Sequence, residues 1–91
     1  MSTAVRDNPA RSRFELDVGG GTAVANYKVA GGVITFTHTE VPPQSRGHGA
    51  ASQLIGDALA AVRARGLKVA AQCSFVRAYL EKHPELADLL A

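Results

Sequence analysis

The sequence predicts a small α+β domain built on a mixed β-sheet. Three segments within residues 13–41 alternate apolar and polar residues, the period of a half-buried strand, and glycine turns separate them. Residues 50–65 place apolar side chains at helical spacing, and residues 67–73 alternate again. Strand, helix and strand in this order predict two parallel strands joined by a right-handed crossover. We therefore expect an antiparallel three-strand meander, a helix, a parallel fourth strand and a C-terminal helix.

Turn residues mark the ends of the three meander strands. Gly19–Gly21 and Gly31–Gly32 separate them, and Pro42 and Pro43 end the third because proline has no N–H to offer a neighbouring strand. Regular alternation along this third strand predicts that four side chains share one face of the sheet. These four are Ile34, Phe36, His38 and Glu40.

The two helices have their own boundary signals. Gly66 ends the first helix, after two arginines in its last turn. Ser74 is the expected N-cap of the second, which runs to about Lys82 and stops before Pro84.

Length, cysteine content and hydropathy restrict the class of protein. Ninety-one residues form one domain; we assign residues 1–12, which are polar, to a flexible N-terminal tail and residues 13–91 to the folded domain. The single cysteine, Cys73, cannot form an internal disulfide, which favours a reducing compartment such as the cytoplasm. No segment is long and apolar enough for a membrane span, so no membrane partner is expected.

The distribution of charge argues against nucleic acid as a partner. The formal net charge is +2, and the three arginines and one aspartate of residues 1–13 account for all of it. The remaining residues, 14–91, are neutral overall, so the domain has no basic face of the kind that binds a phosphate backbone. Three histidines and one cysteine also lack the regular spacing of zinc ligands, and no metal is predicted.

The loop between the third strand and the first helix has the composition of an anion site. Gln44-Ser45-Arg46-Gly47-His48-Gly49 contains two glycines that let a ligand approach the backbone. The first N–H groups of the following helix have no partner within it, and the helix dipole favours negative charge there. A phosphate or pyrophosphate would suit this site. Alternatively, the glycines serve only the packing of a helix entry turn.

The same loop resembles the acyl-CoA pyrophosphate loop of the GNAT acyltransferase superfamily. Gln44, Gly47 and Gly49 match its Gln/Arg-x-x-Gly-x-Gly/Ala pattern. The ordered segments HTEVP, RGHG, GLKV, CSFV and KHPE extend the likeness to small single-domain GNAT-like proteins over roughly residues 13–90. The resemblance implies a minimal GNAT-like fold whose third and fourth strands diverge, so that the pantetheine arm of acetyl-CoA lies between them. Implied cofactor-binding residues are Val41, Gln44, Arg46, Gly47, His48, Gly49, Ala50, Ala51, Cys73 and Tyr79.

Three side chains are candidates for the chemistry. Glu40, or His38 two residues before it, would remove a proton from an amine acceptor. Cys73 precedes a helix N-terminus, where a thiol pKa falls, and the resemblance places it near the acyl group; it would either carry the acyl group or only line the site. A buried, unreactive cysteine is the alternative. Tyr79 stands one place before the family's usual tyrosine acid, and packing against Phe75 is its alternative role.

The resemblance implies an N-acetyltransferase-like protein that moves an acetyl group from acetyl-CoA to an amine. The acceptor, a small molecule or a protein, is not identified. Gly19–Gly21 stand where larger GNAT enzymes carry two helices, so the acceptor side is expected to be open. The rival interpretation is a noncatalytic CoA-binding or protein-interaction module. We expect a monomer or a weak homodimer.

Overall fold

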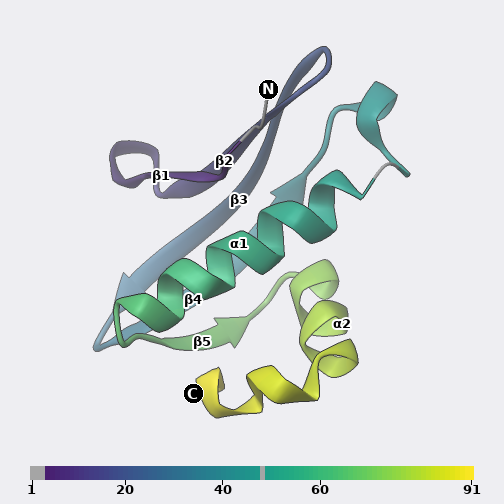
Figure 1. Ribbon diagram of the computed structural model, residues 1–91. Helices are drawn as coiled ribbons and strands as arrows, with labels where there is room; N and C mark the ends of the chain where they lie inside the picture. The colour runs from purple at the N-terminus through teal and green to yellow at the C-terminus, as the bar shows by residue number, and fades with distance from the viewer. Residues whose placement is uncertain (1–3, 48) are drawn as a thin grey trace.

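The computed structural model describes residues 4–47 and 49–91 and contains one five-stranded sheet with two α-helices (Figure 1). The strand order is β1-β2-β3-β4-β5; neighbours are antiparallel except for β4 and β5, which are parallel. This confirms the predicted α+β class, meander and crossover. The elements are β1 (Arg6–Asn8), η1 (Pro9–Arg11), β2 (Arg13–Val18), β3 (Gly21–Ala30), β4 (Val33–Glu40), η2 (Pro43–Ser45), α1 (Ala50–Ala64), β5 (Lys68–Ala71), α2 (Ser74–Lys82) and η3 (Pro84–Leu89), where η denotes a 3-10 helix.

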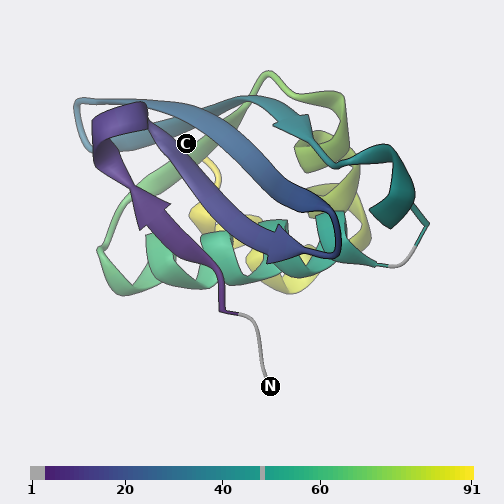
Figure 2. The ribbon, with the colours of Figure 1, turned by 90° about the horizontal axis from the view of Figure 1, so that it is seen from above.

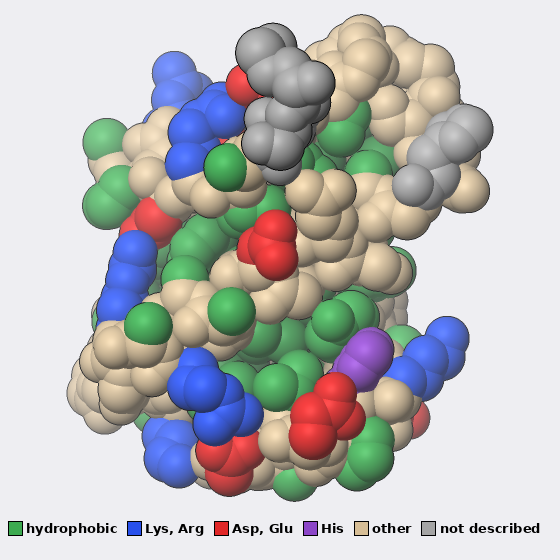
Figure 3. Space-filling view, in the orientation of Figure 1, with side chains coloured by type: hydrophobic (Ala, Val, Ile, Leu, Met, Phe, Trp, Pro, Cys, Tyr) green, Lys and Arg blue, Asp and Glu red, His purple; other side chains and the backbone are tan. Residues whose placement is uncertain are grey.

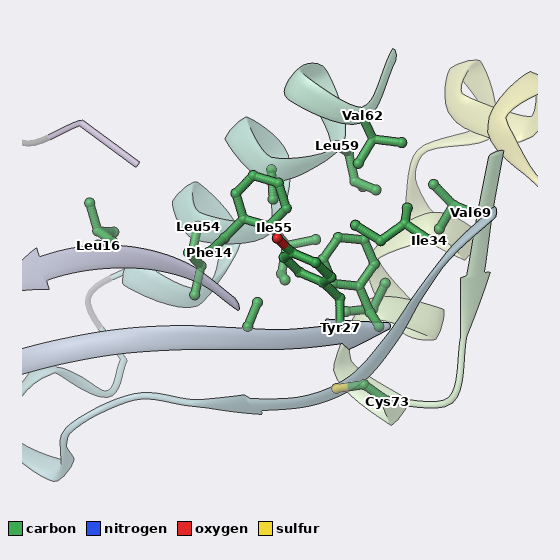
Figure 4. Close-up of a cluster of buried hydrophobic side chains, with 14 of the residues drawn as sticks. Phe14, Leu16, Tyr27, Ile34, Leu54, Ile55, Leu59, Val62, Val69 and Cys73 are labelled. Carbon is green, nitrogen blue, oxygen red and sulfur yellow. The ribbon is translucent and has the colours of Figure 1, made fainter. Parts of the chain in front are cut away.

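Helix α1 covers one face of the sheet, whereas no helix among the described residues lies over the opposite face (Figure 2). The apolar stripe of α1 fills the space between helix and sheet (Figure 4). Leu54, Ile55 and Val62 are fully buried there against Phe14 and Phe36 of the sheet. Each such side chain contributes about 1.5–3 kcal/mol on burial, so this single interface holds the fold together.

Strand β1 lies within the segment that the sequence analysis assigned to a flexible tail, and for Arg6–Asn8 that assignment was wrong. These residues pair with β2, opposite Arg13–Glu15. Glu15 is buried, and Arg6, Asn8 and Arg13 surround its carboxylate, with Arg13 Nε at 2.6 Å. The hydrogen bond from Arg13 holds the pKa of Glu15 below its ordinary value, against the effect of burial. A three-residue strand held by side-chain contacts has no periodicity to detect.

Asp7 joins β1 to the core from the other face. Its carboxylate accepts a hydrogen bond from Tyr27 Oη at 2.5 Å and pairs with Arg65, beyond α1, at 2.8 Å. Burial, and then the hydrogen bond to Asp7, raise the pKa of Tyr27 to about 12. The N-terminal segment therefore closes the edge of the core.

A β-bulge in β4 overturns the predicted face assignment. Tyr27 pairs with Phe36, but the preceding residue Asn26 pairs with His38, so β4 has one extra residue at this point. The extra residue reverses the alternation. His38 and Glu40 lie on the helix-free face, opposite to Phe36, while Thr39 pairs with buried Ala25 on the face of α1.

The C-terminal elements start and stop near the predicted residues. Cys73, with an extended backbone, is the N-cap of α2, one residue before the predicted Ser74. From Pro84 the chain forms the 3-10 helix η3. The chain then returns to the free edge of β5, where Ala91 N–H donates to the Val69 carbonyl at 2.9 Å. Among the described residues, no helix has the length and apolarity needed to cross a bilayer.

Candidate functional site

Three adjoining hollows form a groove along the N-terminal end of α1, and Phe75 of α2 lines all three. The first, of about 290 Å³, lies over Arg46, Gly47 and the first turn of α1. The second, of about 300 Å³, borders the end of β4 and contains His38, Thr39 and Glu40. The third, of about 250 Å³, lies between α1 and α2. We refer to them as the loop, strand and helix hollows of the groove.

The backbone of the loop hollow combines two glycines with the N-terminus of a helix. Gly47 and Gly49 have φ values of +83° and +79°, which side-chain-bearing residues rarely adopt. Gly49 is the N-cap of α1 and has no side chain to satisfy the first N–H groups of the helix. Those N–H groups are therefore available to a negatively charged ligand at the positive end of the helix dipole. His48, also a predicted binding residue, lies outside the described residues.

Side chains next to this backbone fix the loop in place. Gln44 Nε2 donates to the Gly20 carbonyl at 3.0 Å, and Ser45 Oγ donates to the Gly19 carbonyl at 3.1 Å. Gln44 thus holds the loop against the β2–β3 turn; its direct contact with a cofactor stays a prediction. Arg46 Nε donates to the Val41 carbonyl at 3.2 Å, while its exposed side chain lines both the loop and strand hollows.

Strands β4 and β5 separate beside the strand hollow, which confirms the expected divergence. Their last pair is Phe36 with Ala71. The N–H groups of Gln72 and Cys73 then both donate to the Phe36 carbonyl, at 2.9 and 3.1 Å, and the chain turns into α2. The segment 37–40 of β4 consequently has an edge that faces no strand of the described chain. Amide groups of a ligand could pair with such an edge.

Cys73 lies at this point of divergence, at the margin of the buried cluster (Figure 4). Its side chain is 9% exposed, and Sγ is 3.3 Å from Thr39 Oγ1. Burial alone would raise the pKa of the Cys73 thiol. Hydrogen bonds from the Thr39 side chain and from the backbone of Val76, Phe75 and Thr39 outweigh burial and lower the pKa. The Cys73 thiol therefore loses its proton more readily than an ordinary cysteine, although it is largely covered.

His38 and Glu40 form an exposed pair on the helix-free face. Their side chains are 60% and 69% exposed, with His38 Nε2 3.3 Å from Glu40 Oε1. Both line the strand hollow together with Thr39. The edge of β4 therefore brings together three groups of different chemistry: a carboxylate and an imidazole open to solvent, and a covered thiol on the other side of the strand.

Tyr79 lies in the helix hollow, away from these groups. Its ring stacks on His83, with centroids 4.1 Å apart and an interplanar angle of 24°, instead of pairing with Phe75. The phenol oxygen lies against α1, only 2.8 Å from where a Cβ on Gly56 would be. The hydroxyl is thus directed at a helix backbone. Thr39 and Phe75 were not predicted as site residues; regular alternation assigned Thr39 to the wrong face, and a lone apolar residue on a helix gives no site signal.

Comparison with known proteins agrees with this architecture. The family model of the GCN5-related N-acetyltransferases matches residues 13–89. The solution NMR structure of a GCN5-like protein from Staphylococcus aureus is similar in fold, with a TM-score of 0.68 and 24% sequence identity, covering 97% of this chain and 87% of that one. A comparison with curated proteins found no significant match. On the family match, the chain belongs to the GCN5-related N-acetyltransferase family.

Proposed function

We propose that this protein is an acetyl-CoA-dependent N-acetyltransferase. The observation that carries the proposal is the continuity of the groove: a helix N-terminus capped by a glycine leads, past Phe75, to a strand edge that faces no described strand, beside Cys73, His38 and Glu40. An anion site and an amide-pairing edge in this order fit a ligand that has a pyrophosphate followed by an amide-bearing arm.

In this proposal two parts of the groove hold two parts of acetyl-CoA. The N–H groups of Gly47 and of residues 49–51 hold the pyrophosphate, and the Arg46 side chain adds a charge. The edge of β4 over residues 37–40 pairs with the pantetheine amides, which brings the thioester to the strand hollow. A backbone N–H at this edge polarises the thioester carbonyl.

The acceptor amine approaches from the helix-free face, where Glu40 and His38 are exposed. Glu40 takes a proton from the ammonium group, directly or through water. His38 Nε2 lies 3.3 Å from Glu40 Oε1, and a protonated imidazole there stabilises the negative charge of the Glu40 carboxylate. The amine nitrogen then forms a bond to the acyl carbon, the carbon–sulfur bond breaks, and the CoA thiolate leaves. In the alternative route, the Cys73 thiolate attacks the acyl carbon and the CoA thiolate leaves; the amine then attacks the new thioester and the Cys73 thiolate leaves.

A noncatalytic CoA-binding module is the rival function, and the position of Tyr79 favours it. A phenol directed at Gly56 of α1 is not placed to return a proton to a leaving thiolate. A module of this kind would bind CoA and acetyl-CoA equally but would not consume acetyl-CoA in the presence of amines.

A thermal melt with CoA, acetyl-CoA or free pantetheine tests binding. At one hundred times its dissociation constant, a ligand stabilises the fold by about 2.7 kcal/mol, or roughly 10 °C or more for a domain of this size. We expect a shift with both CoA compounds and none with pantetheine, which lacks the pyrophosphate. No shift with millimolar CoA would overturn the proposal.

Turnover with a panel of amines then tests catalysis. Glu40→Gln should abolish most of the turnover while the affinity for CoA is retained. Glu81→Gln on α2, which removes the same charge outside the groove, should leave turnover unchanged. Full turnover by Cys73→Ala would exclude the covalent route. An absence of turnover in the wild type, combined with CoA binding, would favour the noncatalytic module.

A further inference from the structure

We propose that the surface around the free edge of β5 binds a second copy of this chain, so that two copies form a symmetric homodimer. We call it the edge surface. It consists of Val69, Ala71, Arg77, Leu80, Glu81 and Leu90, which line one hollow. This hollow shares no lining residue with the loop, strand or helix hollow. A partner seated there leaves the lining of the groove uncovered, so neither CoA binding nor turnover depends on the dimer.

The edge surface is largely apolar and hollowed. The hollow has a volume of about 390 Å³ and lies between α2 and the segment that returns to β5. Leu90 on its border is 50% exposed, although its side chain is large and apolar. The surface thus has both an apolar hollow and an exposed apolar side chain. Covering them with a partner removes apolar area from water, which favours association.

The backbone of β5 adds an unpaired strand edge to this surface. In a parallel ladder alternate residues bond to the neighbouring strand, and the N–H groups of Lys68 and Gln72 donate toward β4. The N–H and carbonyl of Ala71 therefore point away from β4. Ala91 pairs with Val69 on this outer edge, but no described backbone group pairs with Ala71 there. An open strand edge of this kind favours contact with another chain.

The charges of α2 favour a second copy as the partner. Arg77 and Glu81 lie one helical turn apart and line the same hollow, yet neither forms an ion pair with any described residue. Arg77 Nη2 is instead 3.4 Å from the Ala71 carbonyl, over the strand edge. When a two-fold axis relates two antiparallel α2 helices, Arg77 of each copy meets Glu81 of the partner subunit. A surface with two opposite charges in this arrangement is complementary to itself.

The apolar groups of the edge surface are self-complementary in the same sense. A two-fold axis brings the exposed Leu90 of each copy to the hollow of the other, so one patch supplies both the side chain and the space that accepts it. Long-range repulsion between copies is weak. The formal net charge is only +2, and basic and acidic side chains are mixed over the face seen in Figure 3. Because exposed ion pairs are individually weak, we expect a reversible dimer.

Sedimentation velocity of the full chain, from micromolar to millimolar concentration, tests the proposal. The wild type should pass from monomer to dimer as the concentration rises. Arg77→Glu and Glu81→Arg each place like charges at both symmetric contacts, so each should weaken the dimer about tenfold. The double variant with both substitutions has opposite charges at both contacts again and should dimerise as well as the wild type.

Lys82→Glu is the matched control for Arg77→Glu. It makes the same change of charge on the same helix, but Lys82 lines the helix hollow and not the edge surface. The dissociation constant of the dimer should therefore be unchanged. Circular dichroism verifies that each variant is folded, as expected for exposed side chains.

Three results would overturn the inference: a wild type that stays monomeric at millimolar concentration, single variants that dimerise like the wild type, or a double variant as weak as the single ones. The last result would show that Arg77 and Glu81 do not face each other across a two-fold axis. The increase in Tm with CoA should be the same in every variant. Loss of the dimer and failure of the proposed function are therefore distinguishable.

Discussion

The contact between Tyr79 and Gly56 decides where the phenol of Tyr79 points, and it can be measured through stability. Gly56 lies in the interior of α1, where glycine costs about 1 kcal/mol relative to alanine. Gly56→Ala should therefore stabilise the helix by that amount if nothing opposes the new methyl group.

Tyr79 opposes it. The added Cβ would stand 2.8 Å from the phenol oxygen, too close for contact, but 3.7 Å from the ring carbon that carries it, an ordinary distance. Displacing the end of a side chain costs about 1 kcal/mol, at the low end for overpacking. Gly56→Ala should thus be nearly neutral in the wild type and stabilising by about 1 kcal/mol in Tyr79→Phe, which lacks the oxygen.

Chemical and thermal denaturation of the four proteins in this cycle measure the coupling. We expect a coupling free energy of about 1 kcal/mol, seen as an increase in Tm of about 4–8 °C on Gly56→Ala in the Tyr79→Phe background alone. The same stabilisation in both backgrounds would refute the placement. The phenol would then be free to point toward the strand hollow, and its role as a proton donor would have to be restored.

Three further predictions concern the thiol, the core and the loop. Thr39→Val removes a hydrogen bond to Cys73 Sγ, so the thiolate is less favoured and the pKa of Cys73 rises. The rate of Cys73 alkylation, measured against pH, should therefore have a higher midpoint than in the wild type. An unchanged midpoint would contradict the contact between Thr39 and Cys73. Burial and the hydrogen bond to β1 raise the pKa of Tyr27 from 10.0 to about 12, so the free energy of unfolding should fall as pH rises through that interval. In Tyr27→Phe this fall should be reduced, and an equal fall in both proteins would exclude Tyr27 as its cause. Gly49→Ala should cost about 1–2 kcal/mol of stability, because Gly49 has a positive φ, and should also weaken CoA binding. Gly31→Ala, at a φ of +59° in a distant turn, should cost stability only. Equal affinities of the two variants for CoA would contradict the role of the loop.

The parts of the fold that follow from periodic patterns could be predicted from the sequence. Helix α1 and the parallel pair β4–β5 follow from a helical stripe placed between two alternating segments, and both are as expected. Strand β1 could not be predicted this way. Its three residues are held by Glu15 and Tyr27, partners that lie 7 to 20 positions further along the chain.

The site was predictable where it depends on the backbone and not where it depends on register. The glycines of the loop predict its backbone conformation, because only glycine readily adopts the positive φ values found at Gly47 and Gly49, and the proposed anion site depends on that conformation. The faces of the sheet on which Glu40 and Thr39 lie depend instead on one extra residue in β4, which the alternation of the sequence cannot reveal. The bulge places the carboxylate on the open face and brings Thr39 to the Cys73 thiol.

The central claim is that CoA occupies the groove with its pyrophosphate on the loop backbone. Amide ¹H–¹⁵N spectra recorded during a titration with CoA test it residue by residue. We predict the largest shifts at Gly47, Gly49 and Ala51, smaller ones at Phe75, and none in strand β1. Unchanged amide signals of the loop at millimolar CoA, or shifts gathered at β1 and β2, would contradict the claim.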